Sequence, residues 1–262
     1  MNATSASRAE SVGSATDASR ILVWDAPVRV FHGLMVLCFA LAWLTAESER
    51  WRLVHVSAGY TVAGLVAFRL IWGFVGTRYA RFSQFVRSPA EAWNDLRDLL
   101  QGKAGHTVGH PVGHTVGHTV GHNPAGAWAI LGLLSLAAGT ALSGWATDRE
   151  WGGHAVEELH EGLAQGLLLL VGVHVAGVIV SSLAHRENLV RAMVTGLRRG
   201  APDQALRSAR AGLAMVLLAA VLAFWGWQWQ TAPVAPVDGG PVGMAAHHGG
   251  QGDGDDDDDD DD

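Results

Sequence analysis

The chain has 262 residues, of which 49% are apolar and 11 are Trp, and its formal net charge is −7. The charge comes mainly from the terminal run Asp255 to Asp262, so the rest of the chain is close to neutral and no nucleic-acid partner is expected. The single cysteine, Cys38, excludes a disulfide framework and any Cys-x-x-Cys site. The apolar residues are gathered in long blocks, which is typical of a membrane protein.

In chain order, residues 1–20 are rich in Ser, Ala and Thr and contain no apolar run that could serve as a signal peptide. We expect this segment to be disordered and cytoplasmic. Five apolar stretches of membrane-spanning length follow, at about 28–46, 54–76, 126–147, 160–182 and 211–229. They predict an all-α integral membrane protein, with a four-helix bundle in residues 21–200 and a fifth transmembrane helix in 201–230.

Two low-complexity segments stand apart from these stretches. One is a loop over residues 102–123, in which histidine recurs every fourth residue at His106, His110, His114, His118 and His122. Such a tract can bind metal ions, but a solvated repeat is the favoured interpretation. The other is the acidic tail 231–262, which is too polar to fold alone and is predicted to be disordered.

The distribution of basic residues predicts the orientation, because cytoplasmic loops hold an excess of Lys and Arg. With the N-terminus in the cytoplasm, only Arg50, Arg52 and Arg149 lie on the outer side, and the other basic residues lie on the cytoplasmic side. We therefore predict a multi-pass membrane protein with the acidic tail on the outer side of the membrane.

Four histidines lie in or at the mouth of separate apolar stretches: His32, His55, His160 and His174. An ionisable side chain is costly in a bilayer and indicates a function there, although a hydrogen bond to a neighbouring helix is the alternative for any one of them. His160 and His174 are 14 residues apart, which is about 21 Å along a helix and nearly one face. Such a pair places one histidine near each membrane surface.

A haem iron with two axial imidazoles needs two histidines that face each other, so four histidines fit two haems. Depth in the membrane predicts that His32 pairs with His174 on the cytoplasmic side and His55 with His160 on the outer side. The haems would be bound non-covalently, because no Cys-x-x-Cys-His site is present.

Arginines near these histidines are candidate partners for the haem propionates. Arg29 lies one turn before His32, Arg69 is about 21 Å along its helix from His55, and Arg52 is close to the outer pair. Anchoring of the helices by the positive-inside rule is an equally good explanation for each.

Several motifs occur in a recognisable order: Asp25-Ala-Pro-Val-Arg29-Val-Phe-His32, His55-x3-Gly59 continuing to Arg69-Leu-Ile-Trp72, His160-x13-His174 and Glu187-Asn-Leu-Val. Together they resemble the prokaryotic cytochrome b561 family, related to the b-type subunits of nickel-iron hydrogenases. The resemblance covers roughly residues 21–200. It implies a four-helix bundle that binds two b haems and passes electrons between quinone and a second redox partner.

The main functional hypothesis is therefore electron transfer between the quinone pool and a periplasmic redox protein such as a c-type cytochrome. Alternatives are direct oxidation of superoxide with quinone as acceptor, a membrane-anchor subunit of a larger oxidoreductase, and a metal-handling membrane protein. No catalytic side chain is assigned, because the redox chemistry would belong to the haems. Whether the chain is an enzyme or a homodimer stays open.

Overall fold

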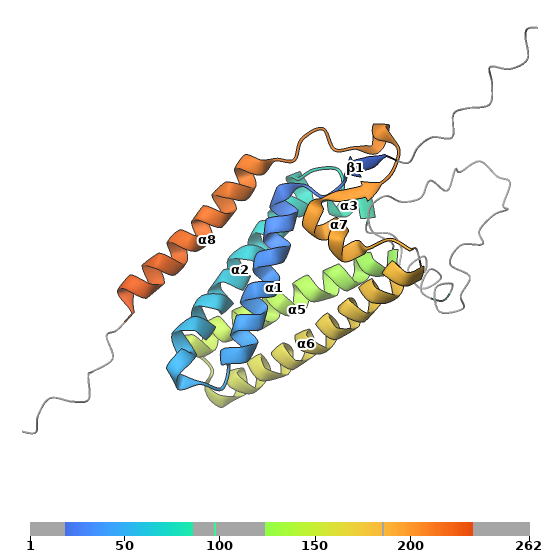
Figure 1. The fold of residues 1–262 in the computed structure, drawn as a ribbon. Coiled ribbons are helices and arrows are strands. Elements are labelled where there is room, and N and C mark those ends of the chain that lie inside the picture. Colours follow the sequence, from blue (N-terminus) through green and yellow to red (C-terminus); the bar gives the residue numbers. More distant parts are fainter. Residues whose placement is uncertain (1–18, 86–96, 98–123, 185, 233–262) are drawn as a thin grey trace, which may run out of the picture.

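Five long helices form the protein in a computed structural model that describes residues 19–85, 97, 124–184 and 186–232. They are α1 (Ala26–Thr45), α2 (Arg52–Val75), α5 (Pro124–Asp148), α6 (Gly153–Ala184) and α8 (Ala211–Thr231) (Figure 1). All five are long and apolar enough to cross a membrane, which confirms the five predicted stretches. The fourth begins at Gly153 rather than near residue 160, so His160 lies two turns inside its helix.

Several short elements were not predicted. The strands β1 (Arg20–Leu22) and β2 (Leu197–Arg199) pair antiparallel, with Ile21 opposite Arg198, and α3 (Phe82–Phe85) and α7 (Leu189–Thr195) lie at the same end of the bundle (Figure 1). The 3-10 helices are η1 (Glu49–Trp51) and η2 (Pro202–Gln204). The protein is mostly helical, in agreement with the predicted fold class, and the sheet is a small addition to it. Three-residue strands are too short to leave a period-two pattern in the sequence, so the sheet was not foreseen.

The long helices pack in an open series. Helix α6 packs along α5, α5 against α2, α2 along α1, and α8 against α1 and, less extensively, α2. Between the described residues, neither α1 nor α2 makes extensive backbone contact with α6. The backbones of α1 and α2 are therefore further from α6 than the backbones of directly packed helices are from each other. Side chains from α1 and α2 meet those of α6 across this wider space.

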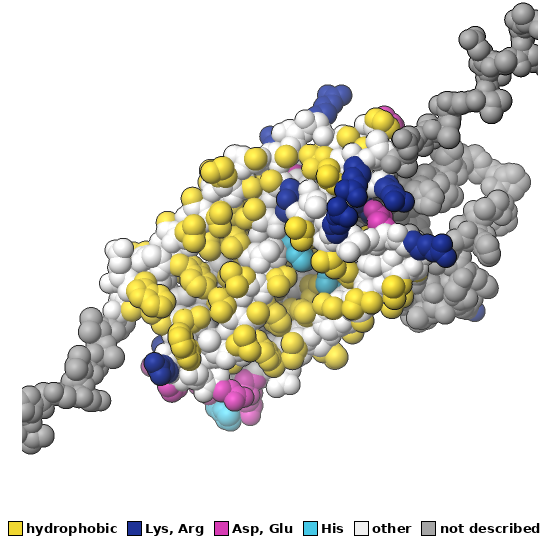
Figure 2. Space-filling model, viewed as in Figure 1, with side chains coloured by type: hydrophobic (Ala, Val, Ile, Leu, Met, Phe, Trp, Pro, Cys, Tyr) yellow, Lys and Arg dark blue, Asp and Glu magenta, His cyan; other side chains and the backbone are white. Residues whose placement is uncertain are grey.

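A buried cluster holds α1, α2 and α5 together, with Phe31, Cys38, Leu65 and Leu134 among its members. The outward faces are different, because many large apolar side chains on them are exposed, such as Phe74 at 74% and Leu169 at 71%. Figure 2 shows the broad hydrophobic surface this produces on one face. Lipid is the medium that such a surface requires, and the chain is a multi-pass membrane protein.

The two ends of the bundle carry opposite charge. We call the end with β1, β2, α7 and the start of α1 the basic end; Lys and Arg side chains gather there in Figure 2. We call the other end, with the α1–α2 and α5–α6 turns, the acidic end; it carries Glu47, Glu49, Asp148, Glu150, Glu157 and Glu158. Three sequence expectations lie wholly or mainly outside the described residues: the segment 1–20, the loop 102–123 and the tail 231–262.

Candidate cofactor site

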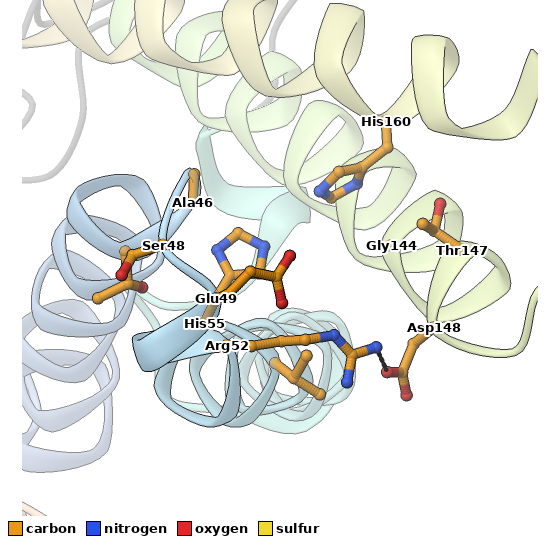
Figure 3. A pocket seen from close by; sticks show the side chains of 11 residues that line it. Ala46, Ser48, Glu49, Arg52, His55, Gly144, Thr147, Asp148 and His160 are labelled. Atoms are coloured by element: carbon orange, nitrogen blue, oxygen red, sulfur yellow. Dashed lines mark hydrogen bonds and ion pairs between the residues drawn. The ribbon is translucent and has the colours of Figure 1, made fainter. Parts of the chain in front are cut away.

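His55 of α2 and His160 of α6 face each other near the acidic end. Their ring centroids are 6.2 Å apart and their ring planes lie at 83°. Figure 3 shows both rings projecting into the space between the two helices. Since α2 and α6 do not pack closely on each other, the two imidazoles are the groups that meet across this space.

The Nδ1 atom of each ring is held by a backbone carbonyl of a neighbouring helix. His55 Nδ1 lies 2.8 Å from the oxygen of Ala42, and His160 Nδ1 lies 3.0 Å from the oxygen of Thr140. A carbonyl only accepts hydrogen bonds, so Nδ1 carries the proton in both rings. In the neutral form of each ring, Nε2 is then the nitrogen without a proton and the one available as a metal ligand, the arrangement expected of metal-binding histidines.

These two rings fit a haem iron between them. An imidazole nitrogen coordinates a metal at about 2.0 Å, so two rings on opposite sides of one iron have centroids about 6 Å apart. The observed 6.2 Å agrees with that spacing. The described residues contain no group of three or more His, Cys, Asp and Glu side chains that could hold a bare metal ion.

A glycine of α5 makes room for the His160 ring. A Cβ atom at Gly144 would lie 2.8 Å from Cε1 and 3.1 Å from Nδ1 of His160, closer than packed side chains come. The hydroxyl of Ser143 is 3.2 Å from the same Nδ1. Both residues of α5 therefore lie against the ring of His160 and contribute to its position.

A pocket of about 180 Å³ opens beside the two histidines, and charged side chains line its mouth (Figure 3). Arg52 Nη2 donates to Asp148 Oδ1 at 3.0 Å, and the hydroxyl of Tyr60 donates to Asp148 Oδ2 at 2.9 Å. Thr147 also lines the pocket, and its buried Oγ1 has no hydrogen-bond partner among the described residues. Arg52, predicted to meet a haem propionate, is thus at the pocket but is paired with a carboxylate of the protein.

His32 of α1 and His174 of α6 form the second pair, toward the basic end. Both side chains are half-buried, and they are close enough to interact electrostatically. Helices α1 and α6 do not pack extensively on each other here either, so this pair also meets across a space. The structure brings together the same two pairs that helix depth predicted, while their roles as iron ligands stay predictions.

The two arginines predicted beside the second pair lie at the basic end. Arg69 is only 4% exposed, and its guanidinium carbon lies 4.9 Å from the centroid of the Phe82 ring. The Nε atom of Arg29 is buried and has no hydrogen-bond partner among the described residues. The burial of Arg69 and of the Nε atom of Arg29 at the basic end is compatible with an anionic ligand nearby.

Sequence reasoning missed the groups that hold the histidines. The carbonyls of Ala42 and Thr140 are invisible in a sequence, because every residue has one. Gly144 carried a weak signal, as a glycine three residues before the predicted end of the third span, but glycine is common in membrane helices. Asp148 was assigned to the outer surface and not to the pocket mouth.

Comparison with known proteins places these features in a family. The prokaryotic cytochrome b561 family matches residues 23–196, which include both histidine pairs. Two curated relatives, each named "Probable Ni/Fe-hydrogenase 1 B-type cytochrome subunit", come from Escherichia coli strain K12 and from E. coli O157:H7. Each is 35% identical over 77 residues, covering 22% of this chain and 33% of the relative.

The chain therefore spans about a third of the length of these curated relatives. No solved structure matches the chain. The family match covers well over half of the sequence and includes the whole of α1, α2, α5, α6 and α7, and all four paired histidines. On this evidence the chain belongs to the prokaryotic cytochrome b561 family, a family of membrane b-type cytochromes that transfer electrons.

Proposed function

We propose that this chain carries electrons across the bacterial inner membrane, between the quinone pool and a periplasmic redox protein, through two non-covalently bound b haems. The observation that supports it most is that the rings of His55 and His160 face each other at one level of the bundle, while His32 and His174 lie close enough to interact electrostatically at another. His160 and His174 share helix α6 and are separated by about 21 Å of helix rise, a large part of the roughly 30 Å hydrocarbon core.

In this proposal His55 and His160 hold one haem and His32 and His174 hold the other. When bound, each haem supplies one-electron oxidation and reduction of its iron. The protein supplies two imidazoles for each iron, and hydrogen bonds to the carbonyls of Ala42 and Thr140 keep the acidic-end rings in one orientation. Ligands that do not move between the two oxidation states favour rapid electron exchange.

Arg29 and Arg69 are proposed partners for the propionates of the basic-end haem, and Arg52 for those of the acidic-end haem. Arg52 would have to share its guanidinium between a propionate and Asp148, to which it is bonded. Its five donors make such sharing feasible.

The orientation follows from the charges. The basic end is proposed to face the cytoplasm and the acidic end the periplasm, with the C-terminal tail, as the positive-inside rule requires. Acidic residues around the mouth of the pocket favour a cationic redox partner, such as a basic c-type cytochrome, and disfavour an anionic reductant such as superoxide.

A second candidate is the membrane subunit of a larger oxidoreductase. The two curated relatives are named as hydrogenase cytochrome subunits, and this supports a role in which a catalytic subunit delivers electrons to the bundle. Gentle solubilisation from the native membrane separates the candidates: a stoichiometric catalytic subunit in the purified complex supports the second, and a chain without one supports the first.

The experiment for the main proposal is a reduced-minus-oxidised optical spectrum with a haem-to-protein ratio, on the purified chain and on His174→Ala and His55→Ala. We expect two low-spin b haems in the wild type and one in each variant. A wild type made with adequate haem supply and yet without haem would overturn the proposal. Reconstitution with a quinol and an external electron acceptor then tests transfer between them.

A further inference from the structure

The basic end contains a buried charge that the proposed function does not use. Asp25 is 1% exposed, and it lies directly before the first residue of α1. Its Oδ1 accepts a hydrogen bond from the backbone N–H of Val28 at 2.9 Å, which caps the helix. A helix cap needs only one oxygen, and caps are usually exposed to water, so burial of the whole carboxylate calls for another reason.

The second oxygen ties α1 to the end of α2. Asp25 Oδ2 accepts from the indole Nε1 of Trp72 at 3.1 Å and from the hydroxyl of Thr77 at 2.6 Å. An indole N–H and a backbone N–H are donors only, so both carboxylate oxygens act as acceptors, as they do in the ionised form. The structure therefore holds a negative charge inside the protein by three hydrogen bonds.

A buried positive charge accompanies it. Arg69 of α2 lies one turn before Trp72, is 4% exposed, and is close enough to Asp25 to interact electrostatically. Both groups are on the basic-end side of His32: Asp25 precedes His32 by seven residues, which is about 10 Å of helix rise. The His32–His174 pair thus has one buried anion and one buried cation nearby, whereas the acidic-end charges Arg52 and Asp148 face solvent to different degrees.

We propose that Asp25 and Arg69 set the reduction potential of the basic-end haem by opposing each other, with Asp25 lowering it and Arg69 raising it. This inference rests on the proposed function, because it assumes a haem between His32 and His174. A nearby negative charge stabilises the ferric form, which carries one more positive charge than the ferrous form, and a nearby positive charge does the reverse. At about 10 Å and an effective dielectric constant of about 20, one unit charge changes the ferric-to-ferrous ratio by roughly tenfold.

Neutralising each group in the full-length protein tests the proposal. Asp25→Asn keeps a side chain that caps helices well and removes the charge; we expect the potential of the basic-end haem to rise. Arg69→Gln removes the opposing charge, and we expect that potential to fall. In the double variant the two shifts should largely cancel, and the measurement is a spectroelectrochemical titration with two one-electron components.

Two controls separate charge from structure. Trp72→Phe removes one hydrogen bond to Asp25 without changing any charge, and we expect a shift much smaller than that of Asp25→Asn. The acidic-end haem is an internal control, because it is about 21 Å further along the bundle and its potential should stay unchanged.

Equal-signed shifts in Asp25→Asn and Arg69→Gln, or no shift in either while haem is retained, would overturn the charge-setting role. In that case two haems would still be present and the proposed function would stand. Absence of haem from the wild type would instead remove the proposed function itself, so the two failures are distinguishable. If Asp25→Asn alone loses the basic-end haem, the Arg69→Gln variant tests the proposal. The proposal then requires the potential of the basic-end haem to fall in Arg69→Gln, and an unchanged or raised potential would overturn it.

Discussion

The two ends of the bundle hold similar histidine pairs in different ways. At the acidic end, backbone carbonyls and a glycine fix the rings of His55 and His160 beside a pocket that opens to solvent. At the basic end, no described residue hydrogen-bonds to the rings of His32 or His174, and the nearby polar groups are the buried Asp25 and Arg69. A short β-sheet and η2 cover this end, where Tyr79 donates to the carbonyl of Gln204 at 2.8 Å.

This difference separates two ways of preparing a cofactor site. Carbonyls and close packing determine where a ligand ring points, and they depend on the shape of neighbouring residues. Buried charges leave the ring free of direct contact and act on it through the field, which is strong where water is excluded. Changes in shape should therefore damage the acidic end first, and changes in charge should be felt most at the basic end.

The largest effect is expected from Gly144→Val. The added side chain would begin 2.8 Å from the His160 ring, which must turn away from its partner His55. We expect one of the two haems to be lost, at the acidic end, with the basic-end haem intact. Haem content and the optical spectrum measure this, and Gly162→Ala is the matched control, because a Cβ there meets no atom within 4 Å. Retention of both haems by Gly144→Val would mean that the ring is not held as described.

A smaller effect is expected from Asp148→Asn. The substitution weakens the bonds from Arg52 and Tyr60 that join α2 to the end of α5 across the pocket mouth. Because Arg52 is 62% exposed, the ion pair itself contributes at most about 1 kcal/mol. We expect the acidic-end haem to dissociate several-fold faster, with the wild-type rate rising toward that of the variant at high salt. The rate is measured by transfer to apomyoglobin. If the basic-end haem also dissociated faster by the same factor in Asp148→Asn, the two ends would not act independently as described here.

Helix α8 provides a third comparison, because it lies wholly beyond the family match and packs on α1 and α2. Trp225 Nε1 donates to Thr61 Oγ1 at 2.7 Å. Loss of one such bond between membrane helices costs about 0.6 kcal/mol. We expect Trp225→Phe to lower the thermal unfolding temperature slightly and to leave both haem potentials unchanged. Trp227→Phe, at a position 59% exposed, is the control, and a larger loss from Trp227→Phe would argue against the packing of α8 described here.

The smallest effect is expected at the edge of the basic end, in the ion pair between Glu187 and Arg198. Hydrogen bonds from Arg198, at 2.6 Å and 3.2 Å, lower the pKa of the Glu187 carboxyl below its usual value of 4.5. The pair therefore stabilises the connection from α6 to β2 fully above about pH 4.5, and this stabilisation disappears as the pH falls through the lowered pKa. Limited proteolysis near residue 187 should accelerate only in acid. Glu187→Gln should show fast cleavage at every pH, and an unchanged acid response in that variant would assign the effect to another group.

Much of the architecture follows from the sequence because lipid imposes simple rules. A helix must be long and apolar to cross a bilayer, so the five spans could be placed to within a few residues, except at the start of α6. That error arose because Glu157, Glu158 and Glu161 make the first turns of α6 polar, although helix α6 continues beyond the hydrocarbon region. The cap at Asp25 is likewise a local feature, since it depends on a hydrogen bond to the backbone only three residues away.

The histidines and their depth were set by the sequence alone, because spacing along a helix converts directly into height in the membrane. Only the tertiary structure decided what holds each ring: the carbonyls of Ala42 and Thr140, the missing side chain of Gly144 and the pairing of Asp25 with Trp72 and Thr77. These contacts join residues of different elements, and they depend on how the helices rotate and approach one another. Hydrophobic pattern determines which segments enter the membrane, whereas packing between neighbours determines the rotation of each helix and hence the chemistry of the sites.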